Sequence, residues 1–109
     1  MTNPFKNDPF VTVHQAFVNL YHGREYECQW HEDLRGENGD KVLGLTSFTE
    51  GKVPQVFVST AISVSDSVEV YAHELAHVAV GIDRQHDDEW ETAFEAIYQE
   101  YNRLNGYNP

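Results

Sequence analysis

Cysteine is nearly absent from this chain of 109 residues, and its scarcity excludes two kinds of site. Cys28 is the only cysteine, so the chain cannot form an intramolecular disulfide bond. A zinc knuckle built on cysteines is excluded for the same reason. A single cysteine also fits a reducing compartment, where disulfide bonds are rare.

Basic residues are scarce as well. Seven lysines and arginines stand against 18 aspartates and glutamates, which gives a formal net charge of −11. Such a surface repels phosphate backbones, so we expect no direct binding to nucleic acid. An acidic surface can steer a basic partner, but more often it simply keeps a small protein soluble.

Long apolar runs are missing too, so no segment is predicted to span a membrane. The first ten residues lack the basic and then apolar layout of a signal peptide. We therefore expect a soluble cytoplasmic protein. The length allows one domain, residues 1–109, and a hydrophobic content of 40% is enough for one modest core. Six phenylalanines, six tyrosines and two tryptophans argue against disorder.

The first half of the chain predicts one helix followed by three strands. The helix is expected to begin at Asp8 or Pro9 and to end at Gly23, because apolar residues between them recur at helical spacing. Alternating or β-branched residues predict strands over 25–33, 42–48 and 55–59. Residues 34–41 form a loop, and residues 49–54 suit a chain reversal, so we expect an antiparallel sheet.

The second half predicts two helices. Asp66 and Glu69 resemble a capping box, which places the start of the first of these helices at Ser67, and Gly81 ends it. The last helix is expected to begin at Asp87 or Asp88 and to end at Gly106. Its apolar stripe consists of Trp90, Phe94, Ile97, Tyr98, Tyr101 and Leu104.

The motif that carries chemistry lies in the first of these two helices. It reads His73-Glu74-Leu75-Ala76-His77, the H-E-x-x-H pattern. Residues four apart share one face of a helix, so both imidazoles can reach a single zinc ion. Glu74 lies about 100° round the helix from His73, which suits a general base better than a third ligand. Zinc would lower the pKa of a bound water to about 7, within reach of that base.

A catalytic zinc usually has three protein ligands, and His86 is the best candidate for the third. It follows the helix stop at Gly81, and a turn could bring it back to the metal. Trp90 is expected to anchor the last helix against the metal helix. Carboxylates near His86 are alternative ligands: Asp83, Asp87, Asp88, Glu89, Glu91 and Glu95.

These residues resemble a known family. The run from His73 to His77, followed by Gly81, His86 and Trp90, is similar to the SprT-like zinc metallopeptidases and their small phage-borne relatives. The resemblance implies the zinc ligands His73, His77 and His86, with Glu74 as base. It also implies an α+β zincin-like fold with an N-terminal helix, a small antiparallel sheet of about three strands, the metal-binding helix and a C-terminal helix. A bacterium or a phage-infected cell would be its setting.

Other zincin classes fit less well. In peptidases that cleave phage repressors the third ligand comes from further downstream, where Glu95 is the residue to examine. In a zincin the peptide substrate normally lies along a sheet edge, and here 42–48 is the expected edge. Gly44 would let a substrate backbone approach closely, although glycine in a strand is as often a bulge.

Three functions remain open on the sequence alone. The first is a zinc-dependent metallopeptidase that acts on a protein or peptide. The second is a zinc-stabilised acidic protein-binding module without turnover, in which Asp87 or Glu89 closes the fourth zinc position in place of water. The third is an acidic interaction domain that binds no metal.

Overall fold

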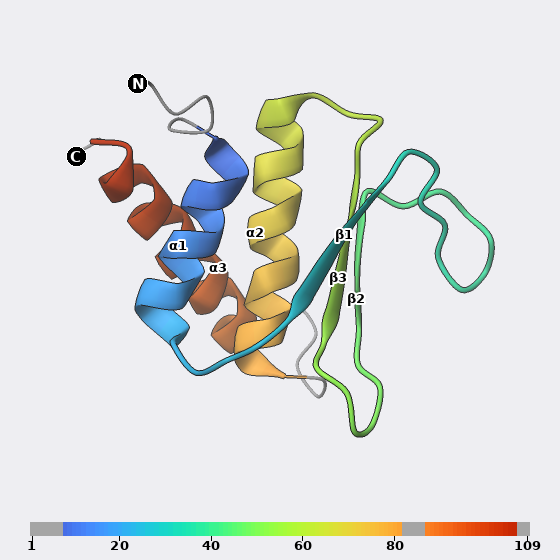
Figure 1. The fold of residues 1–109 in the computed structure, drawn as a ribbon, viewed down its shortest axis with the longest axis horizontal. Helices are drawn as coiled ribbons and strands as arrows, with labels where there is room; N and C mark the ends of the chain where they lie inside the picture. Colours follow the sequence, from blue (N-terminus) through green and yellow to red (C-terminus); the bar gives the residue numbers. More distant parts are fainter. Residues whose placement is uncertain (1–7, 82–86, 107–109) are drawn as a thin grey trace, which may run out of the picture.

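The computed structural model describes residues 8–81 and 87–106. These residues form three helices and three strands, which Figure 1 labels. Their order is α1 (Pro9–Tyr21), β1 (Glu27–His31), β2 (Gly44–Ser47), β3 (Gln55–Ser59), α2 (Val64–Val80) and α3 (Asp88–Leu104). The predicted α+β class is therefore confirmed, as is the order of an N-terminal helix, a small sheet and two further helices.

The helix ends are set by side chains that accept the first backbone N–H groups. Asp8 accepts from the Phe10 N–H at the start of α1, and Asp87 accepts from the Trp90 N–H at the start of α3. Both helices begin where the sequence predicted. None of the helices within the described ranges is both long and apolar enough to cross a membrane.

The predicted start of α2 was wrong by three residues. The helix begins at Val64, because the hydroxyl of Ser63 accepts a hydrogen bond from the Asp66 N–H at 3.1 Å. Asp66 thus lies in the first turn rather than at the cap. The capping interaction therefore joins Ser63 and Asp66, and not Asp66 and Glu69 as predicted. The predicted end at Gly81 is confirmed.

The sheet has the three expected strands, but the prediction that it is antiparallel was wrong for one pair. Its order is β1-β3-β2, with β2 antiparallel and β1 parallel to β3. β3 is the most buried strand, since Val56 and Val58 are fully buried. Only the central strand has a neighbouring strand on both edges, and the most apolar strand, β3, takes this position.

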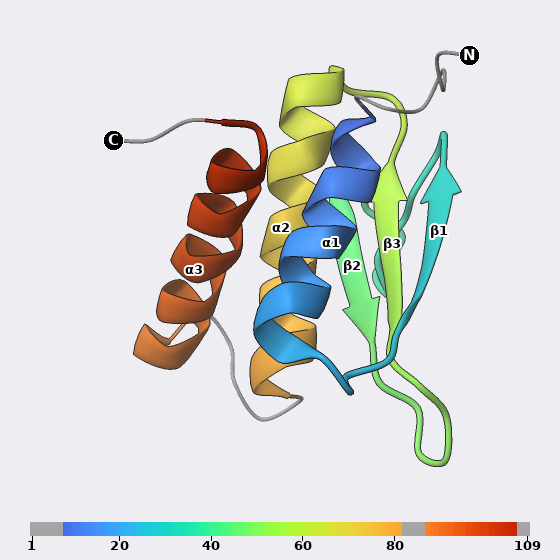
Figure 2. The ribbon, with the colours of Figure 1, turned by 60° about the vertical axis from the view of Figure 1, so that its left-hand side comes forward.

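Helix α2 is the middle layer of the fold. It packs on β2 and β3 with one side and on α1 and α3 with the other. Figure 2 shows this arrangement, with the sheet on one side of α2 and α3 on the far side. The helix is accordingly buried along most of its length, including Tyr71, Leu75 and Ala76.

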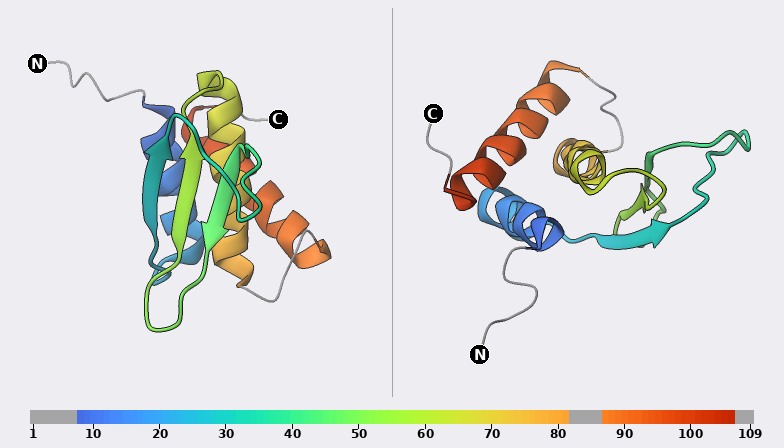
Figure 3. Two further views of the ribbon diagram at one scale, coloured as in Figure 1. Left: turned by 90° about the vertical axis from the view of Figure 1, so that its right-hand side faces the viewer. Right: turned by 90° about the horizontal axis from the view of Figure 1, so that it is seen from above.

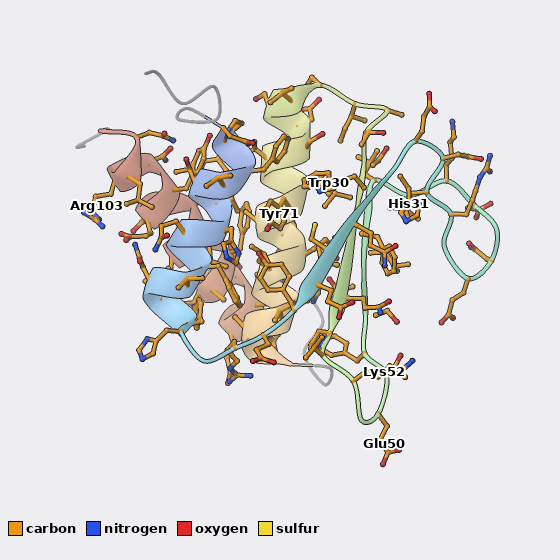
Figure 4. The ribbon with its side chains drawn as sticks, in the orientation of Figure 1. Trp30, His31, Glu50, Lys52, Tyr71 and Arg103 are labelled. Carbon is orange, nitrogen blue, oxygen red and sulfur yellow. The ribbon has the colours of Figure 1, made fainter. Side chains whose placement is uncertain are left out.

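An aromatic cluster closes the core between α1, α2 and β1. Trp30 contacts Phe10 and Tyr71, with ring centroids 4.6 and 5.6 Å away. Figure 4 shows Trp30 and Tyr71 on the helix-facing side of β1 and His31 further along that strand. Cys28 is half-buried against the same core, and burial raises the pKa of its thiol to about 11, which fits a packing role.

We predict that α2 is the element on which the folded state depends. Leu75→Ala removes a side chain that is 0% exposed and should lower the free energy of unfolding by about 2–5 kcal/mol. Leu43→Ala is the matched control, because this side chain is 54% exposed and its loss should cost less than about 0.5 kcal/mol. Urea unfolding monitored by circular dichroism measures both. Equal losses in the two variants would contradict this assignment of the core.

Candidate metal centre

The two motif histidines lie on the same side of α2. The ring centroid of His73 is 5.0 Å from that of Trp90, and the ring centroid of His77 is 5.4 Å from it. Because one indole contacts both imidazoles, the imidazoles are close to one another, as the spacing of four predicts. Leu75 and Ala76 between them are fully buried, which fixes the rotation of the helix about its axis.

Trp90 anchors the N-terminal end of α3 beside the histidines, as predicted. Its indole N–H donates to the backbone carbonyl of His73 at 3.2 Å. Its ring stacks on Phe94, with centroids 5.6 Å apart and planes 5° from parallel. Phe94 in turn lies 4.1 Å from the ring of His73. The imidazoles therefore rest against a wall of two aromatic rings, which limits their rotamers.

Glu74 faces a different element from the histidines, as its position about 100° away requires. Its Oε1 accepts a hydrogen bond of 2.7 Å from the hydroxyl of Thr46 on β2. Its Oε2 lies over Gly44, where a methyl group would come within 2.8 Å of that oxygen. The base is thus directed at the sheet, while the histidines face α3.

Burial raises the pKa of the Glu74 carboxyl above its ordinary value, and the hydrogen bond from Thr46 partly offsets the rise. A raised pKa means that the folded state binds this proton more tightly than the unfolded state does. The contribution of Glu74 to stability is therefore best at acidic pH and declines as the pH rises past its unfolded-state pKa. A carboxylate held in this way is also a stronger proton acceptor than an exposed one.

Strand β2 lies at the edge of the sheet, as expected for residues 42–48. In Figure 3 (left) it is the strand nearest α3, and no other strand within residues 8–81 and 87–106 pairs with its outer side. The Ser59 N–H donates to the carbonyl of Leu43 at 2.9 Å. In an antiparallel pair, the backbone N–H and C=O groups of successive residues point alternately toward and away from the neighbouring strand. Leu45 therefore also directs its backbone groups to β3, whereas Gly44 and Thr46 direct their backbone groups to the open edge.

The third predicted ligand, His86, lies outside the described residues, as does Asp83. Of the alternative ligands, Asp87 caps α3 through its Oδ1, and Asp88, Glu89, Glu91 and Glu95 are exposed on that helix. In the part of the chain that the structure describes, no three histidine, cysteine or acidic side chains are close enough together to hold a metal ion. The two imidazoles still suit zinc as a pair of ligands, because they share one face of α2.

A shallow hollow lies beside His73, between α2 and α3. Its volume is about 450 Å³. It is lined by Glu69, Phe94, Glu95, Tyr98 and Gln99. Glu69 connects it to the histidines, because its Oε1 is 4.0 Å from the Nε2 of His73. The surface next to the motif is therefore acidic and aromatic.

Comparison of the chain with models of protein families, with curated proteins and with solved structures yields no match. The resemblance to SprT-like peptidases and the zincin-like fold accordingly stay predictions.

Within residues 8–81 and 87–106, Thr46 is a residue of this site that was not predicted from the sequence. Strand alternation does place Thr46 and Gly44 on the same face of 42–48. Nothing local in the sequence says that this face meets Glu74, which lies 28 residues further along the chain. The contact exists because β2 and α2 pack together.

We predict that the partly buried carboxylate of Glu74 lowers the stability of the metal-free protein at neutral pH. With a chelator present, Glu74→Gln should unfold at a higher temperature than the wild type at pH 7.5, because it removes a buried charge and keeps an acceptor for Thr46. The gain should disappear near pH 4, where the wild-type carboxyl is protonated. Glu50→Gln, in the exposed turn labelled in Figure 4, is the control and should show no such pH-dependent gain. A Glu74→Gln variant that is less stable at pH 7.5 would contradict the prediction.

Proposed function

We propose that the protein is a zinc-dependent metallopeptidase. The observation that carries the proposal is how α2 places the three motif residues: His73 and His77 lie against the same indole on the side of α3, and Glu74 is partly buried against the edge strand β2. Two ligands and a base on one immobile helix form the core of such a site. His86 is proposed as the third ligand on the strength of the sequence alone.

The chemistry divides between the metal and the chain. Zinc, when bound by the histidines, supplies a Lewis acid and brings the pKa of water to about 7. Glu74 accepts a proton from the attacking water and donates it to the leaving amine as the C–N bond breaks. Its raised pKa suits it to both steps, because a carboxyl with a pKa closer to neutrality gains and loses a proton more readily.

The edge strand supports a peptide as the substrate. Gly44 and Thr46 present backbone N–H and C=O groups at the open edge of β2, where an extended chain can pair with them. On the face toward the helix, Thr46 donates a hydrogen bond to Glu74, and Gly44 leaves space for the Glu74 side chain. A peptide paired with β2 would thus run past the base.

The resemblance of the motif to the SprT-like peptidases agrees with this proposal and adds the expectation of an α+β zincin-like fold. A cytoplasmic setting in a bacterium or a phage-infected cell belongs to the same proposal. No role with nucleic acid is proposed, since the net charge of −11 disfavours phosphate binding.

The alternative is a zinc-stabilised acidic module that binds a protein without cleaving it. The hollow beside His73 favours it, because this hollow is shallow and lined by two glutamates. In that case a fourth protein ligand, Asp87 or Glu89, would replace water on the metal. The two functions share the zinc site and differ in turnover.

We predict that the protein purified without chelator holds about one zinc ion per chain. His73→Ala, His77→Ala and His86→Ala should each reduce zinc affinity by at least tenfold, because each removes one of three ligands. His22→Ala is the control, since His22 lies at the end of α1, is exposed, and should leave the zinc content unchanged. Elemental analysis and competition with a chromophoric chelator measure both quantities. Wild-type protein without stoichiometric zinc would favour the metal-free interaction domain.

We predict further that Glu74→Gln keeps zinc but loses hydrolysis. The amide preserves the shape of the side chain and cannot accept the proton, so kcat on fluorescein-labelled casein should fall by about 100-fold or more. Glu50→Gln should cleave casein at the wild-type rate. Full activity in the Glu74→Gln variant would rule out this mechanism. Wild-type protein that holds zinc and cleaves no casein would support the binding module.

A further inference from the structure

The contact between Thr46 and Glu74 joins two elements that the proposed reaction uses. Thr46 belongs to edge strand β2, and Glu74 belongs to metal helix α2. The Thr46 hydroxyl is 2.7 Å from Oε1 of Glu74 and 3.2 Å from its backbone carbonyl oxygen. A hydroxyl carries one proton, and the shorter contact, to a charged acceptor, is the stronger of the two. The donation therefore goes to Oε1.

Gly44 also lies next to the Glu74 carboxylate. Gly44 and Thr46 are two residues apart, so both face α2. A methyl group on Gly44 would lie 2.8 Å from Glu74 Oε2 and 2.6 Å from Val70 Cγ1. The absence of a side chain at Gly44 thus leaves the space that Oε2 occupies.

From these contacts we propose that Thr46 is a positioning residue for the general base. Its hydroxyl engages Oε1 of Glu74, so Oε2, for which Gly44 leaves room, is the oxygen left to exchange the proton with water. This inference rests on the proposed function. It goes beyond it by assigning separate tasks to the two carboxylate oxygens and by giving the edge strand a part in the chemistry.

The proton transfers balance with this assignment. Water loses one proton to Oε2 as its oxygen bonds to the peptide carbonyl carbon. The leaving nitrogen takes that proton from Oε2 as the C–N bond breaks, so Glu74 ends as a carboxylate and the products are an acid and an amine. Oε1 stays bonded to Thr46 throughout. A carboxylate held at one oxygen needs no reorientation between the two transfers.

The coupling to substrate follows from the register of β2. Gly44 and Thr46 direct their backbone N–H and C=O groups to the open edge, and the side chain of Thr46 and the open Cα of Gly44 face Glu74. A peptide that pairs with these two residues is therefore fixed relative to the strand that also fixes the base. One rigid strand sets the distance between the scissile bond and Oε2.

Thr46→Val and Thr46→Ser form the matched pair that tests the role of the hydroxyl. Valine has nearly the same shape and favours a strand equally, but it cannot donate a hydrogen bond. Thr46→Val should lower kcat on fluorescein-labelled casein by roughly 10- to 100-fold, as expected for a misplaced reacting group, with KM within about twofold of wild type. Thr46→Ser retains the hydroxyl and should recover most of the lost kcat.

Gly44→Ala tests the space over the strand. On its own it also collides with Val70, so the test uses Gly44→Ala combined with Val70→Ala, which leaves Glu74 as the nearest obstacle. The double variant should lose kcat, because Oε2 is displaced. Val70→Ala alone is the control and should keep the wild-type kcat. Equal activity in the double variant and its control would overturn the part assigned to Gly44.

A measurement on the zinc-free protein makes the test independent of turnover. At pH 8 the carboxyl carbon of Glu74, labelled with ¹³C, should shift in Thr46→Val relative to wild type and should not shift in Thr46→Ser. Before zinc is removed, the three proteins should hold the same amount of it, which excludes a general loss of structure. An unchanged Glu74 resonance in Thr46→Val would overturn the assigned contact.

The results separate this inference from the function on which it rests. Wild-type protein that cleaves casein, together with a Thr46→Val variant of equal kcat, overturns the role of Thr46 alone. A fall in kcat that Thr46→Ser does not recover also overturns it, because the strand rather than the hydroxyl would then be responsible. A wild-type protein that holds zinc but cleaves no casein overturns both the peptidase function and the positioning role.

Discussion

The packing of α2 between the sheet and the other two helices is the constraint on which the rest of the molecule depends. Leu75 and Ala76 are fully buried, so the helix cannot rotate without exposing them. That fixed rotation sends His73 and His77 toward α3 and Glu74 toward β2. The motif residues are therefore held by the core itself, and their arrangement costs little additional ordering when a ligand arrives.

The functional groups on the two sides of α2 are held by different kinds of contact. On the α3 side, aromatic rings hold the imidazoles by shape, and Trp90 ties α3 to the helix backbone. On the β2 side, the Glu74 carboxylate is partly buried, with the Thr46 hydroxyl as its described hydrogen-bond donor. Burial raises the pKa of Glu74 and lowers stability at neutral pH, while a raised pKa is what a general base requires. Stability and proposed activity thus oppose each other at this residue.

Much of the fold and part of the site followed from the sequence. Apolar periodicity and capping residues placed α1, α3 and all three strands, because these signals are local. The start of α2 was misplaced, since Asp66 and Ser63 are both acceptable caps and only the packing of Ser67 under β3, where its hydroxyl donates to the carbonyl of Ser59, shows which is used. The parallel pairing of β1 was missed because neighbours in sequence favour antiparallel hairpins.

The sequence by itself determined that two histidines share a helix face with a glutamate about 100° away, because helix geometry is the same wherever that helix lies. It also determined where α1 and α3 begin and where the three strands lie. Only the tertiary structure decided what each face of α2 meets: Trp90 on one side, Thr46 and Gly44 on the other. Those contacts join residues 17 to 30 positions apart, and they arise from burial of apolar surface across the whole domain, which no local pattern encodes.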